Sequence, residues 1–333
     1  MRILITGTAG FIGNALALRL LKAGHVVHGV DAVTDYYDVR LKRDRLARLA
    51  AHEHFTPHEI RLEDMAAMEA AFAVAKPDVV VHLAAQAGVR HSLEHPRDYV
   101  DTNVVGSFNV TELCRRHGVA HFVLASTSSA YGANDSYPFR ETDRAVFPTT
   151  IYAATKQASE LIAHSHSHLH DVPTTCLRFF TIYGPWGRPD MALFKFTKAM
   201  FEGRAIDVYN HGRMQRDFTY IDDLVAGIAA LIDVPPVRDE PVEGDSLSPV
   251  APYRLVNIGN SEPVALMDFI REIEAATGHT AMLNMMEMQP GEVVKTYADS
   301  GLLFRLTGVR PNTPVRAGVR AFVDWYRSYY RPG

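Results

Sequence analysis

The sequence predicts an α/β protein, with a doubly wound parallel sheet and a smaller C-terminal α/β part. In the first half, short apolar runs alternate with helical patterns, which is typical of parallel strands covered by helices on both faces. A glycine-rich turn at residues 7–13 joins the first apolar run to the first helical pattern. After Phe180 the alternation loosens into a stretch rich in Gly and Pro. With 333 residues, the chain is long enough for roughly two domains.

The elements of the first part follow from hydrophobic periodicity. Residues 3–5 form a continuous apolar run, as expected of a buried strand, whereas apolar residues recur every fourth position from 12 to 20, as expected of a helix. In the same way we predict strands at 26–30, 56–60, 79–81, 121–124 and 174–177, and helices at 40–49, 65–74, 96–116 and 150–169. Right-handed crossovers between these strands place the helices on both faces of one sheet.

The second part of the chain has a less regular pattern. We predict helices at 192–201, 221–232, 265–276 and 314–330, and one further strand at 255–258. Residues 233–252 contain five prolines and several acidic residues, so we expect a mobile surface loop there.

Composition and charge exclude several classes of protein. Lys and Arg total 34 and Asp and Glu total 38, and this net charge of −4 argues against nucleic acid as the main partner. The two cysteines, Cys114 and Cys176, provide no disulfide framework and fit a reducing compartment. No signal peptide and no apolar run of about 18 residues is visible, so we predict a cytoplasmic protein without a membrane partner.

The turn at residues 7–13 has the composition of a phosphate-binding turn. Gly7, Gly10 and Gly13 allow a tight turn and close approach of the backbone to a pyrophosphate, while Phe11 and Ile12 begin the helix. The N-terminus of that helix offers free N–H groups and a positive dipole end to the anion. The alternative is a tight turn without a ligand, but the strand–turn–helix context favours nucleotide binding.

Asp31 stands at the end of the second predicted strand, 18 positions after Gly13 (31 − 13). A carboxylate there accepts hydrogen bonds from the adenosine ribose and repels a 2′-phosphate. The sequence therefore favours NAD over NADP.

Tyr152 and Lys156 form a second chemical signal, because residues four apart share one helix face. A nearby ammonium favours the phenolate of a tyrosine, which makes Tyr152 a usable general base. An exposed Tyr and Lys on a helix are common without any function. However, residues 126–131 (STSSAY) follow a predicted strand, at the sheet edge where ligands bind, and offer hydroxyls to the same substrate.

Together these motifs resemble the extended short-chain dehydrogenase/reductase superfamily, which has a Rossmann-like fold. The resemblance covers nearly the whole chain and rests on residues 7–13, Asp31, 82–86 (HLAAQ), Asn103, 126–131, Tyr152, Lys156 and 178–181 (RFFT). It is closest to the nucleotide-sugar 4-epimerases. Residues 183–192 (YGPWGRPDMA), 209–212 (YNHG) and 216–223 (RDFTYIDD) resemble the UDP-glucuronate 4-epimerases, which interconvert UDP-glucuronate and UDP-galacturonate.

The resemblance implies catalytic roles for Thr127, Tyr152 and Lys156. Tyr152 takes the proton of the sugar 4-hydroxyl while NAD⁺ takes the hydride from C4; the 4-keto sugar rotates, and the hydride returns to the opposite face. We expect tightly bound NAD that is recycled in each turnover. The residues implied in cofactor binding are Gly7, Gly10, Phe11, Ile12, Gly13, Asp31, Leu62, Ala84, Ala85, Gln86, Asn103, Tyr152 and Lys156.

The 4-keto intermediate of a uronate is a β-keto acid and can lose CO₂. We expect the hydroxyls of Thr127, Ser128, Ser129 and Thr181 to hold the carboxylate away from the geometry that favours this loss. Decarboxylating relatives carry Glu at the position of Ser129, dehydrating relatives carry an Asp-Glu pair at 128–129, and galactose-type epimerases usually carry Asn at the position of Thr181.

Three arginines complete the expected substrate site. Arg188 and Arg216 are the cations expected at the UDP end, because Arg binds phosphate in bidentate fashion, and Arg90 is a further candidate. A surface salt bridge is the alternative for each of them. One departure from the family concerns the cofactor: Arg61 stands where relatives carry an Asp that bonds adenine, which leaves the backbone near Leu62 for this task.

The resemblance implies an NAD domain at 1–180, with return segments near 218–232 and 253–260, and a mainly UDP-sugar-binding domain at 181–333. It also implies a homodimer through the helices at 96–116 and 150–169. Three alternatives stay open: an epimerase of UDP-glucose or UDP-N-acetylhexosamine, a UDP-glucuronate decarboxylase, and a non-catalytic NAD sensor. We expect no metal at His164, His166, His168 and His170, because a carboxylate to complete the site is lacking.

Overall fold

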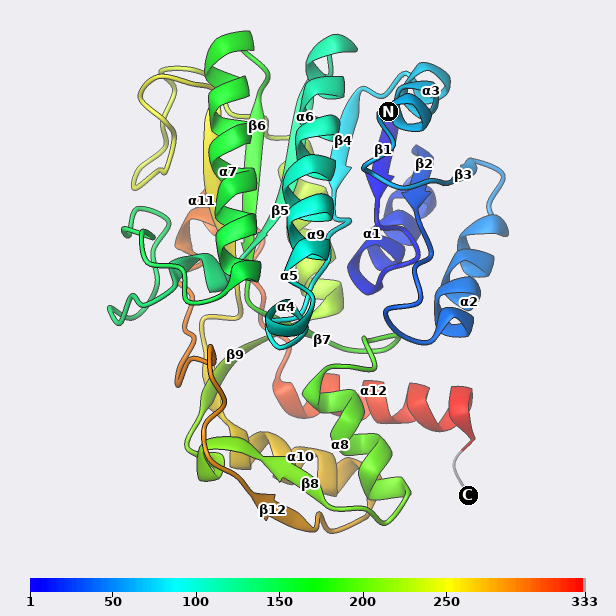
Figure 1. The fold of residues 1–333 in the computed structure, drawn as a ribbon, viewed down its shortest axis with the longest axis vertical. Coiled ribbons are helices and arrows are strands. Elements are labelled where there is room, and N and C mark those ends of the chain that lie inside the picture. Colours follow the sequence, from blue (N-terminus) through cyan, green and yellow to red (C-terminus); the bar gives the residue numbers. More distant parts are fainter. Residues whose placement is uncertain (332–333) are drawn as a thin grey trace.

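The computed structural model describes residues 1–331 and contains a seven-stranded parallel sheet in the order β10-β6-β5-β4-β1-β2-β3. Its strands are β1 (Arg2–Thr6), β2 (Val26–Asp31), β3 (Phe55–Glu59), β4 (Val79–His82), β5 (His121–Thr127), β6 (Thr174–Phe179) and β10 (Tyr253–Ile258). The strand order reverses between β1 and β4 (Figure 1), and ligands of such sheets bind beyond the carboxyl ends of the strands at this reversal. The predicted doubly wound α/β sheet is confirmed.

Helices cover both faces of this sheet. They are α1 (Phe11–Lys22), α2 (Val39–Ala50), α3 (Met65–Ala75), α6 (Ser107–Arg116), α7 (Ile151–His170), α9 (Ile221–Ile232) and α11 (Gly301–Thr307). The short helices α4 (His91–Glu94) and α5 (Pro96–Tyr99) pack against α7. Within residues 1–331, no helix is long and apolar enough to cross a membrane.

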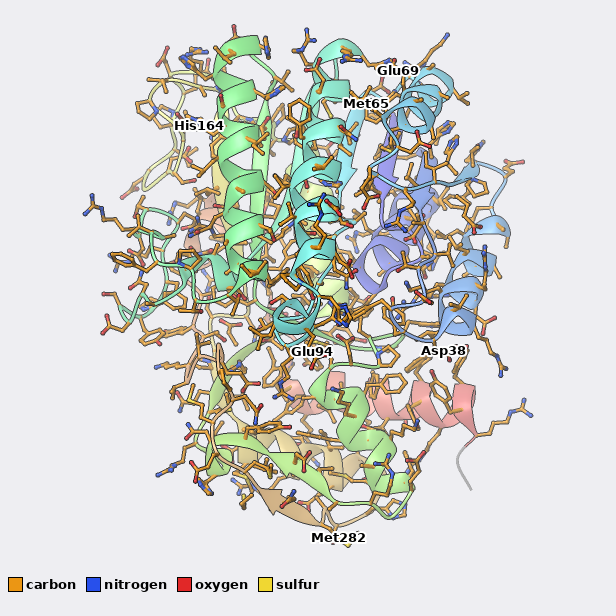
Figure 2. The ribbon with its side chains drawn as sticks, in the orientation of Figure 1. Asp38, Met65, Glu69, Glu94, His164 and Met282 are labelled. Atoms are coloured by element: carbon orange, nitrogen blue, oxygen red, sulfur yellow. The ribbon has the colours of Figure 1, made fainter. Side chains whose placement is uncertain are left out.

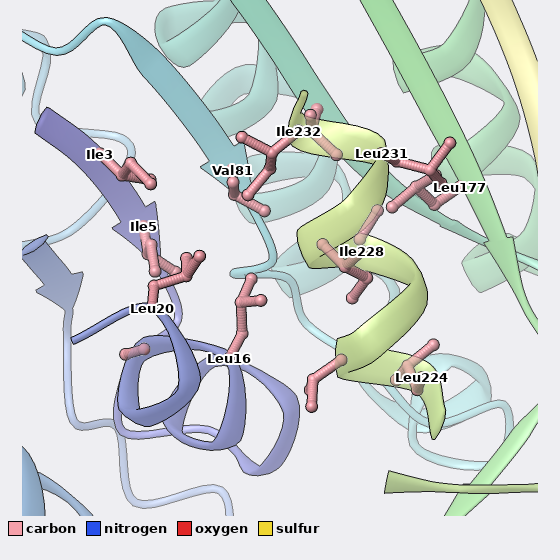
Figure 3. Close-up of a cluster of buried hydrophobic side chains, with 14 of the residues drawn as sticks. Ile3, Ile5, Leu16, Leu20, Val81, Leu177, Leu224, Ile228, Leu231 and Ile232 are labelled. Carbon is pink, nitrogen blue, oxygen red and sulfur yellow. The ribbon is translucent and has the colours of Figure 1, made fainter. Parts of the chain in front are cut away.

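Alternate residues of β1 point into two separate hydrophobic cores, as the pleat of a strand requires. Ile3 and Ile5 pack with α1 and α9 on one face of the sheet (Figure 3). Leu4 points to the other face and joins the core formed with α3, α6 and α7. Burying each such side chain contributes about 1.5–3 kcal/mol, so both layers fix the sheet that carries the turn at residues 7–13.

The single helix predicted at 96–116 is interrupted. A π-helical segment, Val100–Gly106, separates α5 from α6. Within it, the backbone carbonyl of Asn103 accepts a hydrogen bond from the Ser159 hydroxyl of α7 at 2.7 Å. Segments of this kind often mark functional sites, because they redirect a side chain, and periodicity alone does not reveal them.

The smaller part of the molecule lies beyond the carboxyl ends of the sheet strands (Figure 1). Its core is rich in aromatic residues, including stacked Phe218 and Phe269 with ring centroids 4.0 Å apart. Its strands and helices are β7 (Thr181–Tyr183), α8 (Ala192–Phe201), β8 (Ile206–Val208), β9 (Gln215–Tyr220), β11 (Pro263–Ala265), α10 (Leu266–Thr277), β12 (Leu283–Met285) and α12 (Val315–Tyr330). Four of these strands have only three residues, too short for a periodic signal, whereas α9 and β10 return to the larger part.

Residues 233–252 form a loop as expected, but hydrogen bonds attach its second half to β10 and α7. Asp245 accepts two hydrogen bonds of 2.8 Å from Arg254 on β10, and both side chains are at most 4% exposed. His164 of α7, labelled in Figure 2 beside this loop, lies 2.9 Å from the Ser248 hydroxyl.

Candidate active site

A cavity of about 950 Å³ opens between the carboxyl ends of the central strands and the segment that begins the smaller part. Most of the residues predicted for the site line it together. They are Gly7, Gly10, Phe11, Ile12, Gly13, Asp31, Leu62, Ala84, Ala85, Gln86, Thr127, Ser128, Ser129, Tyr152, Lys156, Thr181 and Arg188.

The glycine positions of the turn at residues 7–13 leave no room for a side chain. Gly7 has φ +85°, and a Cβ on Gly13 would lie 2.1 Å from the carbonyl oxygen of Gly7. Gly10 precedes α1 as its N-cap residue and has no side chain that could cap the helix. The first N–H groups of α1 therefore face the cavity without a side-chain hydrogen-bond partner. This arrangement suits an anionic group such as a pyrophosphate.

Asp31, at the end of β2, is hydrogen-bonded to the glycine-rich turn. Its carboxylate accepts hydrogen bonds from the backbone N–H groups of Ala9 at 2.9 Å and Val33 at 2.8 Å. Four lone-pair positions are available on a carboxylate, so acceptor capacity remains for a ribose hydroxyl.

Arg45 is a buried residue behind the cavity lining whose supporting role the sequence analysis missed. Its fully buried guanidinium donates to the carbonyl of Ala9 at 3.0 Å and to the carbonyls of Trp186 and Gly187 at 2.6 and 3.1 Å. The side chain thus joins the glycine-rich turn to the segment that carries Arg188. Its position in the polar helix α2 gave no signal of this role.

Tyr152 and Lys156 lie on the first two turns of α7, which begins at a side-chain cap: the Thr150 hydroxyl accepts the N–H of Ala153 at 3.1 Å. Burial raises the pKa of Tyr152, while a hydrogen bond with Thr127 and the charge of Arg188 act in the opposite direction. Burial lowers the pKa of Lys156 to about 8. Burial dominates at Tyr152, so its pKa is raised overall and formation of the phenolate depends on the opposing hydrogen bond and charge. Lys156, by contrast, can lose its proton more easily than a solvated ammonium.

Thr127 connects β5 to the hydroxyls that line the cavity. Its side-chain oxygen accepts the backbone N–H of Ser129 at 3.1 Å and so caps the short 3-10 helix Ser128–Tyr131. The hydroxyl hydrogen of Thr127 remains available for Tyr152 or for a ligand.

Behind this edge lies a buried charged group that the sequence analysis missed. Glu160 accepts hydrogen bonds from Arg178 at 3.0 and 2.8 Å and from the hydroxyl of Ser126, the neighbour of Thr127. The signal was present, because Glu160 follows Lys156 by four residues and shares its helix face.

Arg188 faces the same end of the cavity as Tyr152. Its guanidinium pairs with Asp190, with Nε 3.0 Å from Oδ1, and the hydroxyl of Tyr36 donates to the other oxygen of Asp190 at 3.2 Å. Tyr36 also lines the cavity and had no signal in the sequence.

Three predicted site residues lie outside the cavity lining. Asn103 is fully buried behind the wall, where its side chain accepts the N–H of Gln86 at 2.8 Å and donates to the carbonyl of the same residue at 3.0 Å. Arg90 pairs with Glu292 and stacks 4.2 Å from the ring of Tyr209.

The third, Arg216, donates to the carbonyls of Gln215 at 2.9 Å and Val294 at 3.2 Å. Burial lowers the pKa of Arg216, while the charge of Glu292 raises it. Arg90 and Arg216 thus share the neighbourhood of one carboxylate, away from the cavity lining.

A family model described as "NAD dependent epimerase/dehydratase family" matches residues 3–243. The chain belongs to this family. The match spans the glycine-rich turn, Thr127, Tyr152 and Lys156, and the segment that carries Arg188.

Individual relatives share the full extent of the chain. A protein of Rhizobium meliloti (strain 1021) named "Probable UDP-glucuronate 4-epimerase" is 54% identical over 335 residues, covering 99% of this chain and 98% of the relative. "UDP-glucuronate 4-epimerase 2" of Arabidopsis thaliana is 41% identical, covering 99% of this chain and 77% of the relative. A crystal structure of UDP-glucuronic acid 4-epimerase from Bacillus cereus, in complex with UDP-glucuronic acid and NAD, has a TM-score of 0.88 at 30% identity and covers 99% of this chain and 100% of that one.

The cavity of this member of the NAD-dependent epimerase/dehydratase family fits the cofactor for which the family is named. The uncapped start of α1 suits the pyrophosphate, and Asp31 lies where a ribose hydroxyl would donate. At the adenine end, Asn109 donates to the carbonyl of Leu62 at 2.9 Å, and Arg61 lies 3.4 Å from Glu63. The wall near Leu62 is therefore fixed, and Arg61 has a carboxylate partner beside the cavity.

Proposed function

We propose that this chain is a UDP-glucuronate 4-epimerase, which interconverts UDP-glucuronate and UDP-galacturonate through a 4-keto intermediate. One observation carries the proposal: a single cavity brings the hydroxyls of Tyr152 and Thr127 together with those of Ser128, Ser129 and Thr181 and with a guanidinium. The first two suit proton transfer at a sugar hydroxyl, and the remaining groups suit a carboxylate. The names of the relatives and the ligands of the Bacillus cereus structure support the same substrate.

In this proposal Tyr152 is the general base and acid. Its phenolate accepts the proton of the sugar 4-hydroxyl and returns it when the 4-keto group is reduced. Lys156 and Arg188 lower the free energy of the phenolate through their charges, and Thr127 donates a hydrogen bond to it or to the sugar oxygen. NAD⁺, when bound, supplies the hydride acceptor and donor for C4, which keeps the reaction redox-neutral.

The carboxylate of the uronate needs restraint while C4 is a ketone, because the intermediate is a β-keto acid. We infer that Ser128, Ser129 and Thr181 donate hydrogen bonds to the carboxylate and hold the C5–carboxyl bond away from alignment with the carbonyl π orbital. Arg188 lies close enough to influence the pKa of Tyr152, so its charge reaches the reacting end of the sugar as well as the phosphates for which the sequence analysis proposed it.

Arg216 and Arg90 are proposed for the outer, UDP end of the substrate. Both guanidiniums lie near Glu292, at the junction of the larger and smaller parts. Guanidinium groups bind diphosphate oxygens in bidentate fashion, and an exchange of Glu292 for a diphosphate would free both of them for this task. In this division of labour, residues 1–180 carry the cofactor and residues 181–333 carry most of the UDP-sugar contacts.

The association state and location are also part of the proposal. On α6 and α7, apolar side chains of Phe108, Leu161 and Leu169 are 43%, 72% and 65% exposed. Apolar side chains this exposed on neighbouring helices fit a two-fold interface with a second copy, so we propose a homodimer. The two cysteines are free and buried, which fits the reducing cytoplasm.

The alternatives make different products. A decarboxylase would form a pentose product, but enzymes of that class carry an acidic residue at the position of Ser129. An epimerase of neutral sugars would act on UDP-glucose, but such enzymes usually carry Asn at the position of Thr181. A non-catalytic NAD sensor would not need Tyr152 and Lys156. Incubation of the purified protein with each UDP-sugar in turn, followed by chromatographic identification of the products, tests the proposal. Interconversion of UDP-glucuronate and UDP-galacturonate supports it, whereas a pentose as the main product, or conversion confined to UDP-glucose, overturns it.

A further inference from the structure

Two imidazoles and a carboxylate face one another on the rim of the cavity, on α4 and α5. One nitrogen each of His91 and His95 and one oxygen of Asp98 all lie within 4.8 Å of one another. The two imidazole rings stack with centroids 4.4 Å apart, and Nε2 of His91 is 3.9 Å from Oδ2 of Asp98. Among residues 1–331, this is the one group of three or more His, Cys, Asp or Glu side chains with such spacing.

The sequence explains why these three groups converge. Spacings of four and three residues place side chains on one face of a helical segment. His95 precedes Pro96, which disfavours helical backbone at His95, and its φ of −127° and ψ of 57° separate α4 from α5. The two imidazoles stay side by side across this break, with ring centroids 4.4 Å apart, and α5 presents Asp98.

Neighbouring cations are engaged elsewhere. Arg97 pairs with Asp101 at 2.8 Å, and Arg90 stacks on Tyr209 and pairs with Glu292. Asp98 therefore faces His91 rather than a guanidinium. Figure 2 labels Glu94, the last residue of α4, at the level where the larger part of the molecule meets the smaller part.

We propose that His91, His95 and Asp98 bind a divalent transition-metal ion of the Zn²⁺ class. Two His nitrogens and one carboxylate oxygen form a typical three-ligand protein set for this ion, which leaves the fourth position open. Ligand atoms about 2.1 Å from a tetrahedral ion lie about 3.4 Å apart, so the exposed side chains of His95 and Asp98 need to move by only about 1 Å. All three residues line the cavity, so the ion would lie at the wall of the ligand space.

Of the histidines at 164–170, which the sequence analysis considered for metal, His164 and His168 contact the loop at 233–252. His164 lies 2.9 Å from the Ser248 hydroxyl, and Nδ1 of His168 lies 2.6 Å from the Val250 carbonyl oxygen. The spacing of His91, His95 and Asp98 was visible in the sequence, but the sequence analysis did not single it out.

A metal ion bound at this site would restrain the cavity wall. The hydroxyl of Tyr99, on α5, donates to the carbonyls of Ala87 at 3.1 Å and Gly88 at 2.6 Å, both in the wall. An ion that joins α4 to α5 therefore restrains this part of the cavity wall. We expect Zn²⁺ to slow turnover of UDP-glucuronate; this effect rests on the proposed function, whereas metal binding does not.

Isothermal titration of the chelator-treated protein with Zn²⁺ alone tests the site without any substrate. We expect one saturable site, and at least a tenfold loss of affinity in His95→Ala and in Asp98→Asn. His54→Ala is the matched control, because His54 is exposed and lies 3.5 Å from a single carboxylate, that of Glu53; its affinity for Zn²⁺ should equal that of the wild type. Circular dichroism verifies that each variant is folded.

Two results would overturn the site: absence of saturable binding in the wild type, or binding that both His95→Ala and Asp98→Asn retain. In a turnover assay, Zn²⁺ should inhibit the wild type and the His54→Ala variant but not His95→Ala. Lack of any turnover would contradict the proposed function and leave the titration as an independent test of the metal site.

Discussion

Arg178 and Glu160 form a buried, two-bond ion pair directly behind the strand end that carries Thr127. The bonds measure 3.0 and 2.8 Å, and both side chains are less than 8% exposed. Glu160 also accepts a hydrogen bond from Ser126, the residue before Thr127. The pair therefore links α7, which carries Tyr152, to the end of β5.

Substitution Glu160→Gln should destabilise the protein by about 3–5 kcal/mol, because it leaves the charge of Arg178 buried without a counter-ion. Chemical denaturation gives the free energy of unfolding. Glu202→Gln removes the carboxylate of an exposed pair with Arg204 and should cost at most about 1 kcal/mol. Equal losses in the two variants would show that the buried pair has no special role.

Glu141 should make stability depend on pH. Burial raises its pKa to about 7, from 4.5 in the unfolded chain, so between these values the folded state binds a proton that the unfolded state lacks. This contribution, about 3 kcal/mol by linkage, is fully present below pH 4.5 and is lost as pH rises toward 7. The pKa of Asp217 is also raised, to about 6, so Asp217 likewise lowers stability as pH rises. This second contribution remains in any Glu141 variant.

Glu141→Gln keeps an acceptor for the N–H of Asn257, which Glu141 binds at 2.9 Å, but removes the titration. The free energy of unfolding of this variant should fall less between pH 5 and pH 8 than that of the wild type. Denaturation curves at unit pH steps measure the difference. A constant offset between the two proteins at every pH would contradict the assignment.

Tyr152→Phe should reduce epimerisation about 10²–10⁴-fold, because it removes the proposed general base and acid while preserving the ring. Bound NAD, measured by its absorbance after denaturation, should stay unchanged. Tyr326→Phe on α12 removes a hydroxyl outside the cavity and should retain full activity. A Tyr152→Phe variant with wild-type turnover would assign proton transfer to another group.

Ser128→Ala and Thr181→Val should each raise the share of decarboxylated pentose product about tenfold, because each removes one charge-assisted hydrogen bond to the carboxylate. Product ratios from UDP-glucuronate measure this. Ser136→Ala, at an exposed serine, is the control. An unchanged ratio in both site variants would contradict the carboxylate restraint.

Much of this molecule could be predicted from its sequence. Buried parallel strands are continuous apolar runs in the sequence. The spacing of the glycines at residues 7–13 and of Tyr152 and Lys156 is the spacing that the chemistry requires, so these residues could be recognised. The order of the sheet and the joint lining of one cavity follow from the general rules of such folds.

Other features depend on contacts between distant segments. Arg45 joins the glycine-rich turn to carbonyls more than 140 positions away. The side-chain amide of Asn103 lies behind the wall, where it makes two hydrogen bonds with the backbone of Gln86. Strands of three residues such as β7 form only where a partner strand is present. Such features need the tertiary structure, because no local pattern encodes their partners.

The central claim is tested most directly by a proton NMR time course of the purified protein with UDP-glucuronate in D₂O, without added cofactor. The account predicts growth of UDP-galacturonate toward a fixed ratio, with protium retained at C4 and no pentose product. Retention follows because the C4 hydrogen never exchanges with solvent. Deuterium at C4, a pentose as the main product, or no conversion even after NAD is added would contradict the account.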